Sequence, residues 1–174
     1  MSIISKKICL IGHFGVGKTS LIRRFVDRQF SDQYLSTVGV KISRKSIENI
    51  NSEVPKKLTL QLLIWDIEGS TKFKAISTSY FQGATGAIIV GDVTRPESLD
   101  NIAEHFQAFL KANPKGKAVM ALNKSDLIDA EFLEKYQKIY SFSDNISFVS
   151  TYATSAKTGI NVDRIFQSLA YSII

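Results

Sequence analysis

A glycine-rich segment near the N-terminus limits what this chain can fold into more than any other feature. Residues 12–19 read GHFGVGKT, which fits the pattern G-x-x-x-x-G-K-[ST]. The apolar run 8–11 precedes this segment, and a helical pattern over 20–26 follows it. Strand, glycine loop and helix form the context in which such a loop binds phosphate through backbone N–H groups and a helix N-terminus. A glycine-rich turn is the weaker alternative, and the sequence predicts a nucleoside triphosphate site.

The residues of this loop have distinct expected roles. The Lys18 ammonium is expected to reach the β- and γ-phosphates, and the Thr19 hydroxyl is expected to ligate Mg²⁺. The residues expected to surround the phosphates are Gly15, Val16, Gly17, Lys18, Thr19 and Ser20.

Length and composition indicate one domain that spans residues 1–174. With 44% hydrophobic residues the chain can bury a core of its own, and it is too short for two ordinary domains. No apolar run approaches the roughly 20 residues that cross a bilayer. The single cysteine, Cys9, lies in the first apolar run, where we expect a buried hydrophobic side chain. These features favour a reducing, cytoplasmic setting.

The net charge of +6 has two explanations, a solvated basic face or a surface for anionic lipid or nucleic acid. The basic residues that lie close together in the sequence are Lys41, Arg44, Lys45, Lys56 and Lys57. No basic run alternates with aromatic residues, and the sequence carries no nucleic-acid motif. We therefore favour the solvated face and expect no nucleic acid as a partner.

Hydrophobic periodicity predicts strands that alternate with helices. The apolar runs 88–90 and 118–122 have the length of strands buried on both faces, and residues 146–149 are also strand-like. Residues 40–65 read as an antiparallel hairpin at one sheet edge, with the connection at residues 51–55.

Three later segments have apolar residues at helical spacing. The first follows Arg95-Pro96, and the others cover 132–140 and 162–173, with Asn161 placed as an N-cap. The apolar positions of the first segment are Leu99, Ile102, Ala103, Phe106 and Leu110. Strand and helix thus alternate along the chain, which indicates a doubly wound α/β sheet.

Two further motifs follow predicted strands, where the ligands of such sheets bind. Residues 66–69, DIEG, form a D-x-x-G arrangement, in which Asp66 can hold Mg²⁺ and the Gly69 N–H can approach a γ-phosphate. Residues 123–126, NKSD, form N-K-x-D. A carboxylate that accepts two N–H bonds from a base edge selects guanine, because adenine lacks that pair of donors. A backbone N–H of the loop 154–157, TSAK, is placed to read the guanine oxygen.

Together these motifs resemble the Ras superfamily, and most closely its Rab branch, over essentially the whole chain. The resemblance implies the small GTPase fold of the P-loop NTPases: a six-stranded, mostly parallel sheet with one antiparallel edge strand and helices on both faces. It also implies GTP or GDP with Mg²⁺ as ligands. Residues 34–40 are similar to the first switch, and residues 60–69 and 79–84 are similar to the Rab segments on either side of the second switch.

The resemblance assigns site residues one by one. Thr37 is similar to the switch residue that ligates Mg²⁺ and senses the γ-phosphate, so the implied metal ligands are Thr19, Thr37 and Asp66. Phe30 matches the aromatic residue beside the base. The residues similar to the guanine-specificity loops are Asn123, Lys124 and Asp126, followed by Ser155, Ala156 and Lys157.

Three positions around the expected γ-phosphate depart from the family pattern. Most of the family carries DTAGQE at the second switch, where this chain has DIEGST over residues 66–71. Ser70 stands where the water-positioning glutamine belongs, and its shorter side chain cannot reach the same point. Glu68 replaces a small alanine, and Phe14 occupies a position where the family uses a small residue. The resemblance therefore implies preserved nucleotide binding and altered hydrolysis.

Three explanations of these departures stay open at the level of sequence, besides simple drift in an exposed loop. In the first, intrinsic hydrolysis is very slow and a partner's arginine supplies turnover, although Phe14 obstructs that arginine. In the second, Glu68 orients or deprotonates the attacking water; its charge equally predicts repulsion of the γ-phosphate and a preference for GDP. In the third, the protein is a nucleotide-dependent interaction module that does not hydrolyse GTP. We expect slow GTP hydrolysis, with Lys18, Glu68, Gly69 and Ser70 as the catalytic residues.

A switch of this kind implies an effector, an exchange factor and an activating protein as partners. The contact residues expected by family analogy are Tyr34, Val40, Ile42 and Trp65. Rab-like proteins carry C-terminal cysteines for prenyl groups, which residues 173–174 do not supply, and Ser2 does not accept a myristoyl group. We expect a monomer without a lipid anchor of its own, cytoplasmic and brought to membranes through a partner.

Overall fold

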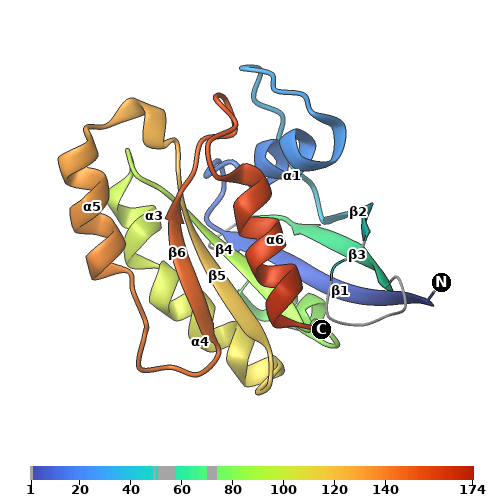
Figure 1. The fold of residues 1–174 in the computed structure, drawn as a ribbon. Helices are drawn as coiled ribbons and strands as arrows, with labels where there is room; N and C mark the ends of the chain where they lie inside the picture. Colours follow the sequence, from blue (N-terminus) through green and yellow to red (C-terminus); the bar gives the residue numbers. More distant parts are fainter. Residues whose placement is uncertain (1, 49, 51–57, 70–73) are drawn as a thin grey trace.

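The computed structural model describes residues 2–48, 50, 58–69 and 74–174, and one β-sheet runs through them (Figure 1). Its six strands lie in the order β2-β3-β1-β4-β5-β6. The strands are β1 Ser2–Gly12, β2 Val40–Glu48, β3 Leu58–Ile67, β4 Gly86–Asp92, β5 Lys117–Asn123 and β6 Phe148–Ala153. The helices are α1 Lys18–Asp27, α2 Lys74–Phe81, α3 Pro96–Asp100, α4 Ile102–Ala112, α5 Ala130–Ile139 and α6 Val162–Ser172.

Five strands run in the same direction, and β2 runs against them at one edge. The pairs β1–β3, β1–β4, β4–β5 and β5–β6 are parallel, whereas β2 pairs with β3 in antiparallel register. The predicted fold class and the predicted edge hairpin are confirmed. The predicted connection at 51–55, with Lys56 and Lys57, lies outside the described residues. Because the five parallel strands point the same way, their carboxyl ends meet at one edge of the sheet.

Helices cover both faces of the sheet, and each face has its own apolar core (Figure 1). On one face α1 and α6 pack on β1, β3, β4 and β5, and the Phe25 and Phe166 rings stack with centroids 4.1 Å apart. On the other face α4 supplies the buried rings of Phe106 and Phe109. Cys9 is fully buried in this second core, as predicted. The central strand β4 is buried along its whole length, which explains its uninterrupted apolar run.

The last strand begins later than the sequence predicts. The prediction placed it at residues 146–149, whereas β6 covers Phe148–Ala153, so the predicted start is wrong. A turn occupies the preceding residues, because the Asn145 side chain accepts the Ser147 N–H at 2.9 Å. Ile146 is consequently 89% exposed, and its apolar character does not reflect burial in a strand.

The helix predicted after Arg95-Pro96 is divided into α3 and α4, which adjoin at Asn101. The buried residues of α4 are Ile102, Phe106 and Phe109. Two expected positions therefore differ: Ala103 is exposed, and Phe109 is buried in place of Leu110, which is only partly buried.

Asn161 precedes α6 as predicted, but its side chain does not cap that helix. The Asn161 amide donates instead to Ala153 O at 2.8 Å. No helix within the described ranges is long and apolar enough to cross a membrane.

Candidate functional site

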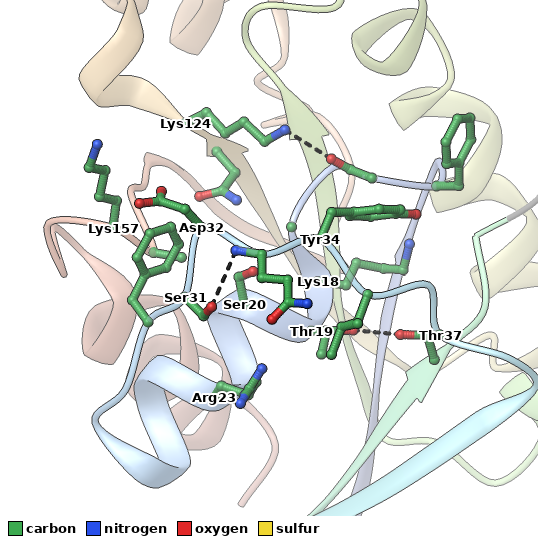
Figure 2. A pocket seen from close by; sticks show the side chains of 18 of the residues that line it. Lys18, Thr19, Ser20, Arg23, Ser31, Asp32, Tyr34, Thr37, Lys124 and Lys157 are labelled. Atoms are coloured by element: carbon green, nitrogen blue, oxygen red, sulfur yellow. Dashed lines mark hydrogen bonds between the residues drawn. The ribbon is translucent and has the colours of Figure 1, made fainter.

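A cavity of about 660 Å³ opens at the carboxyl ends of the parallel strands (Figure 2). The glycine loop after β1 forms its floor, and the start of α1 and the segment 29–37 form further walls. The loops after β3, β5 and β6 complete it. The predicted site residues that line this cavity are Gly15, Gly17, Lys18, Thr19, Ser20, Phe30, Thr37, Glu68, Gly69, Asn123, Lys124, Asp126, Ala156 and Lys157. Val16, Asp66 and Ser155 lie directly behind this lining.

Lys18 lies at the bottom of the cavity with its ammonium already held in place. Its Nζ donates to Gly12 O at 2.8 Å and to His13 O at 3.0 Å. Burial lowers the pKa of Lys18 to about 8, and the nearby Asp66 carboxylate acts in the opposite direction. Gly69 packs against this point so closely that a Cβ there would lie 2.5 Å from Gly12 O. A glycine is therefore required where the loop after β3 crosses the glycine loop.

Three oxygen-bearing side chains meet beside Lys18. The Thr19 hydroxyl lies 2.6 Å from that of Thr37 and donates to Asp66 Oδ2 at 2.5 Å. Within the described residues, Asp66 Oδ1 is buried and has no hydrogen-bond partner. Burial raises the pKa of Asp66, against the hydrogen bond from Thr19 and the charge of Lys18. Two threonine hydroxyls beside a carboxylate that keeps one oxygen without a partner form a donor set that suits Mg²⁺.

Asn123 and Lys124 brace the glycine loop from the end of β5. The Asn123 amide donates to Val16 O at 2.9 Å, and its own oxygen accepts the Thr154 hydroxyl at 3.1 Å. The Lys124 ammonium donates to Gly15 O at 3.0 Å and pairs with Asp92 Oδ2 at 2.8 Å. The Val16 side chain itself is fully buried in the core, so this residue offers the cavity only its backbone.

Asp126 stands at the other end of the cavity, where the loop after β6 meets it. The Ser155 hydroxyl donates to Asp126 Oδ1 at 2.7 Å, which orients the carboxylate. Ala156 is almost fully buried behind this pair, and Lys157 is exposed at the rim. Phe30 packs partly against the core formed with α1 and also faces the cavity. An oriented carboxylate between an aromatic ring and a loop backbone can recognise a planar base that carries paired N–H donors.

Glu68 joins the two segments that resemble switches. Its Oε2 accepts the Gly39 N–H at 2.9 Å, and its backbone N–H donates to Gly39 O at 2.8 Å. The Glu68 side chain thus holds the segment after Thr37 rather than standing free in the cavity. Ser70, predicted as a catalytic position, lies outside the described residues. Phe14 reaches the rim of the cavity, and 53% of its surface is exposed.

Three residues contribute to the site through side-chain contacts that the sequence did not predict. Thr154 orients Asn123, and Asp92 neutralises Lys124. Arg95 contacts the glycine loop from outside the cavity. Asp92 carries a recognisable signal, because it is a charged residue at the end of a strand that is otherwise apolar. Thr154 lies 31 positions from its partner Asn123, and Arg95 lies 81 positions from its partner Phe14. A local sequence pattern does not reveal contacts between residues so far apart.

Comparison with known proteins agrees with this arrangement. The sequence pattern of the Ras family matches residues 7–174, which is nearly the whole chain. The chain belongs to the Ras family. Among its Ras-family relatives, GTP-binding protein ypt1 from Schizosaccharomyces pombe is 36% identical over 170 residues, covering 96% of this chain and 79% of that protein. Ras-related protein RABD2a from Arabidopsis thaliana is 35% identical, with coverage of 96% and 79%.

A further Ras-family relative is Ras-related protein Rab-13 from Canis lupus familiaris, which is 36% identical over 97% of this chain and 79% of that protein. The predicted membership and the predicted likeness to the Rab branch are both confirmed. This member of the Ras family is a Rab-like GTP-binding molecular switch.

Proposed function

We propose that the cavity binds GTP or GDP together with Mg²⁺, and that the domain formed by residues 1–174 hydrolyses GTP slowly. The observation that carries this proposal is the convergence of Lys18, the Thr19–Thr37–Asp66 cluster and Asp126 on one cavity of about 660 Å³. One end offers cationic and metal-binding groups for phosphates, and the other offers a carboxylate for the base.

The phosphates would lie over the glycine loop. Lys18 points to the cavity from the start of α1, so its ammonium and the backbone N–H groups at the helix start would face the β- and γ-phosphates. A bound phosphate favours the charged form of Lys18 against the effect of burial. The Mg²⁺ ligands would be Thr19 and Thr37, with Asp66 directly or through water. When bound, the metal would neutralise charge on the β- and γ-phosphates.

The guanine base would lie between Phe30 and the loop 155–157. The Asp126 carboxylate, oriented by Ser155, would accept the two N–H groups of guanine, and the backbone N–H of Ala156 would face the guanine oxygen. Asn123 and Lys124 would support the phosphate loop from the same end of the sheet.

Slow hydrolysis is proposed because the residues that would position the attacking water are changed. Ser70 replaces the glutamine of the family pattern, and the carboxylate of Glu68 is engaged by the Gly39 N–H. We infer that Glu68 links the two switch segments instead of acting as the base for water. The link would favour the closed arrangement in which Thr37 faces Thr19.

The loops around 31–40 and 66–82 would respond to the γ-phosphate, because Thr37 and Gly69 face the place where it would lie. An effector would read the face that carries Tyr34 and Ile42, which are 60% and 52% exposed. Trp65 lies partly buried on the same strand pair, with the Lys7 ammonium 3.6 Å from its ring centroid. An exchange factor and an activating protein would control loading and turnover, in a cytoplasmic protein that reaches membranes through partners.

A non-hydrolysing interaction module is the second candidate function, and the engaged Glu68 carboxylate favours it specifically. Both functions need guanine-nucleotide binding, so binding is tested first. The assay is displacement of a fluorescent GDP by unlabelled GDP, GTP or ATP, with and without EDTA.

We expect GDP and GTP to compete and ATP not to compete, and we expect EDTA to accelerate nucleotide release. Asp126→Ala removes the acceptor for two N–H donors and should weaken GDP binding at least ~100-fold, since each bond to a charged group contributes about 1.5–3 kcal/mol. Asp144→Ala removes the same charge at an exposed loop position and serves as the control. Equal competition by ATP and GDP, or unchanged binding in Asp126→Ala, would contradict the proposal.

A further inference from the structure

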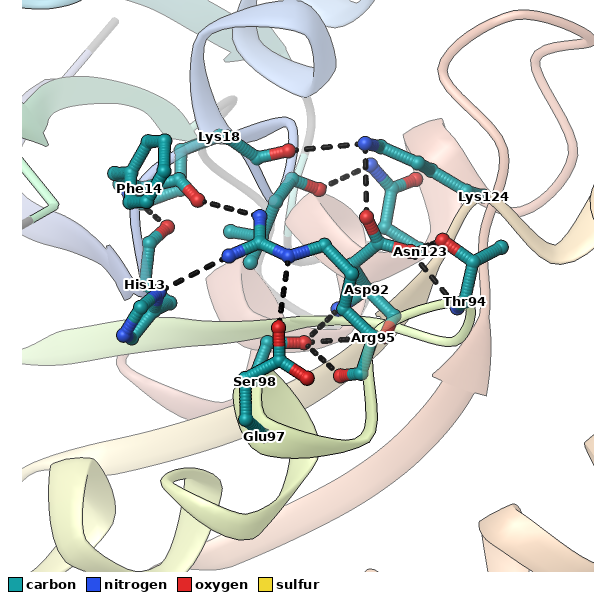
Figure 3. A network of polar contacts seen from close by, with 12 residues as sticks. His13, Phe14, Lys18, Asp92, Thr94, Arg95, Glu97, Ser98, Asn123 and Lys124 are labelled. Atoms are coloured by element: carbon teal, nitrogen blue, oxygen red, sulfur yellow. Dashed lines mark hydrogen bonds and ion pairs between the residues drawn. The ribbon is translucent and has the colours of Figure 1, made fainter.

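Arg95 contacts the glycine loop although it belongs to none of the nucleotide-binding motifs in the sequence. It lies immediately before α3, and its guanidinium reaches the loop from the end of β4 (Figure 3). Nη1 donates to Phe14 O at 2.7 Å, and Nη2 lies 3.2 Å from His13 Nδ1. On its other side, Nε donates to Glu97 Oε1 at 3.3 Å. The residue that precedes α3 thereby contacts two consecutive residues of the loop, His13 and Phe14.

The contact with Phe14 O is one of three side-chain hydrogen bonds to consecutive carbonyls of the glycine loop. Phe14 O, Gly15 O and Val16 O accept hydrogen bonds from Arg95, Lys124 and Asn123 in turn. In a trans peptide, the carbonyl and the N–H of the following residue point in opposite directions. Because these three carbonyls point to the side chains of Arg95, Lys124 and Asn123, the N–H groups of residues 15–17 point away from those side chains, to the side where a phosphate over the glycine loop would lie. Such consecutive N–H groups form an anion-binding concavity.

Lys124 and Asn123 belong to the N-K-x-D motif, so Arg95 is the member of the series that no motif supplies. We propose that Arg95 is a positioning residue that turns the Phe14–Gly15 peptide so that the Gly15 N–H faces the distal phosphates of the bound nucleotide. This inference rests on the proposed function, because it refines how the same cavity holds its ligand.

The neighbouring side chains fit this role. The Arg95 guanidinium lies 5.1 Å from the centroid of the Phe14 ring, which covers it from one side. About a quarter of the Arg95 side chain is exposed, so its bonds to the loop are partly sheltered from water. Gly15 has φ +72, and a Cβ there would lie 3.2 Å from Arg95 Nη1. The Phe14 ring thus lies over the Arg95 guanidinium, and the absence of a Cβ at Gly15 leaves room for it.

His13 contributes an acceptor to the same arrangement. Because the Arg95 guanidinium can only donate, His13 Nδ1 must carry a free lone pair at this contact. Burial, followed by the charge of Arg95, lowers the pKa of His13, while Glu97 acts in the opposite direction. A neutral imidazole is consistent with the 3.2 Å separation from Nη2.

The test separates phosphate positioning from general stability by comparing GDP with GMP. GMP has the phosphate next to the ribose but lacks the distal phosphates that would meet the Gly15 N–H. Affinities of both nucleotides are measured by displacement of a fluorescent GDP, for wild type, Arg95→Ala and Arg95→Lys. Arg164→Ala is the matched control, because Arg164 is also an arginine beside an aromatic ring, 6.0 Å from the centroid of Tyr152, and lies away from the cavity.

We expect Arg95→Ala to weaken GDP binding about tenfold, the effect of one lost hydrogen bond of roughly 1.4 kcal/mol. GMP binding should change less than twofold in the same variant. Arg95→Lys should fall between wild type and Arg95→Ala, because an ammonium can donate to Phe14 O but cannot also reach His13 in a fixed fork. Arg164→Ala should bind both nucleotides like wild type. Should Arg95→Ala fail to fold, Arg95→Lys is used instead. A larger loss of GDP affinity than of GMP affinity in this variant supports the inference, and equal losses overturn it.

Two results would overturn the inference and leave the proposed function standing. One is a GDP affinity of Arg95→Ala within twofold of wild type. The other is an equal loss for GDP and GMP, which would make Arg95 a stabilising residue without a role in phosphate placement. Failure of the wild type to bind GDP at all would instead overturn the proposed function, and the inference with it.

Discussion

Gly17→Ala should damage this protein more than the same substitution at another glycine of similar backbone conformation. Gly17 is the residue before α1 and has φ +101, a conformation that disfavours residues with a Cβ. A Cβ at Gly17 would also fall on Asn123 Nδ2, far inside contact distance. Asn123 cannot move away freely, because it is buried and hydrogen-bonded to Val16 O and to Thr154. The substitution therefore combines backbone strain with the loss of a brace.

Gly83 separates these two effects. It has φ +78, and a Cβ there would meet nothing within 4 Å, so Gly83→Ala reports the strain alone. We expect Gly83→Ala to lower the free energy of unfolding by about 1–2 kcal/mol. Gly17→Ala should lower it by about 2–5 kcal/mol, since the two hydrogen bonds of Asn123 add roughly 0.5–1.5 kcal/mol each.

The assay is urea unfolding at a fixed excess of GDP and Mg²⁺, followed by the fluorescence of Trp65, the single tryptophan of the chain. GDP dissociation is measured separately, because lost binding also lowers the stability measured with ligand present. Equal destabilisation in Gly17→Ala and Gly83→Ala would show that Asn123 moves aside without losing its hydrogen bonds, and that the brace adds nothing to stability.

Three further predictions concern the rest of the molecule. Burial raises the pKa of the Cys9 thiol to about 12. Cys9 should therefore not react with a thiol reagent at pH 8 in the native protein, and it should react in urea. A rapid reaction in the native protein would show that β1 opens easily. The pKa of Asp92 is lowered overall, because the hydrogen bonds from Lys124 and Thr94 outweigh the effect of burial. The stability that Asp92 contributes is therefore complete above its ordinary pKa of 3.8 and is lost as pH falls through the lowered value. Between pH 5 and pH 3, wild type should lose more stability than Asp92→Asn. Parallel stability curves for the two proteins would contradict the pairing of Asp92 with Lys124. Phe166→Ala removes the ring stacked on Phe25 and should lower the free energy of unfolding by about 3–5 kcal/mol in urea titrations, whereas a loss below about 1 kcal/mol would show that the site collapses around the missing ring.

Much of the fold could be predicted because its signals are local. The buried strand before the glycine loop and the helix after it reflect apolar spacing within a few residues. The glycine loop and N-K-x-D place their side chains at strand ends, and parallel strands bring those ends to one edge. Family membership followed from the same short motifs, at their spacing along the chain.

The errors and omissions have physical reasons as well. Ile146 has the composition of a strand residue, but the Asn145 turn holds it in solvent. Asparagine is common at helix N-caps, but the Asn161 amide donates to a carbonyl of β6 instead. Arg95 reaches the glycine loop only because α3 begins beside the end of β4, which is a property of the assembled sheet. The engagement of Glu68 by Gly39 likewise depends on the register of β2 against β3.

Single-turnover GTP hydrolysis by the purified protein, loaded with GTP and Mg²⁺, tests the roles proposed for Glu68 and Ser70. Wild type is compared with Glu68→Ala and Ser70→Gln. If Glu68 links the switch segments and Ser70 leaves the water unpositioned, wild type should hydrolyse GTP slowly, Ser70→Gln should be faster, and Glu68→Ala should retain hydrolysis. Loss of hydrolysis in Glu68→Ala, with GTP binding intact, would show instead that Glu68 belongs to a rebuilt catalytic site.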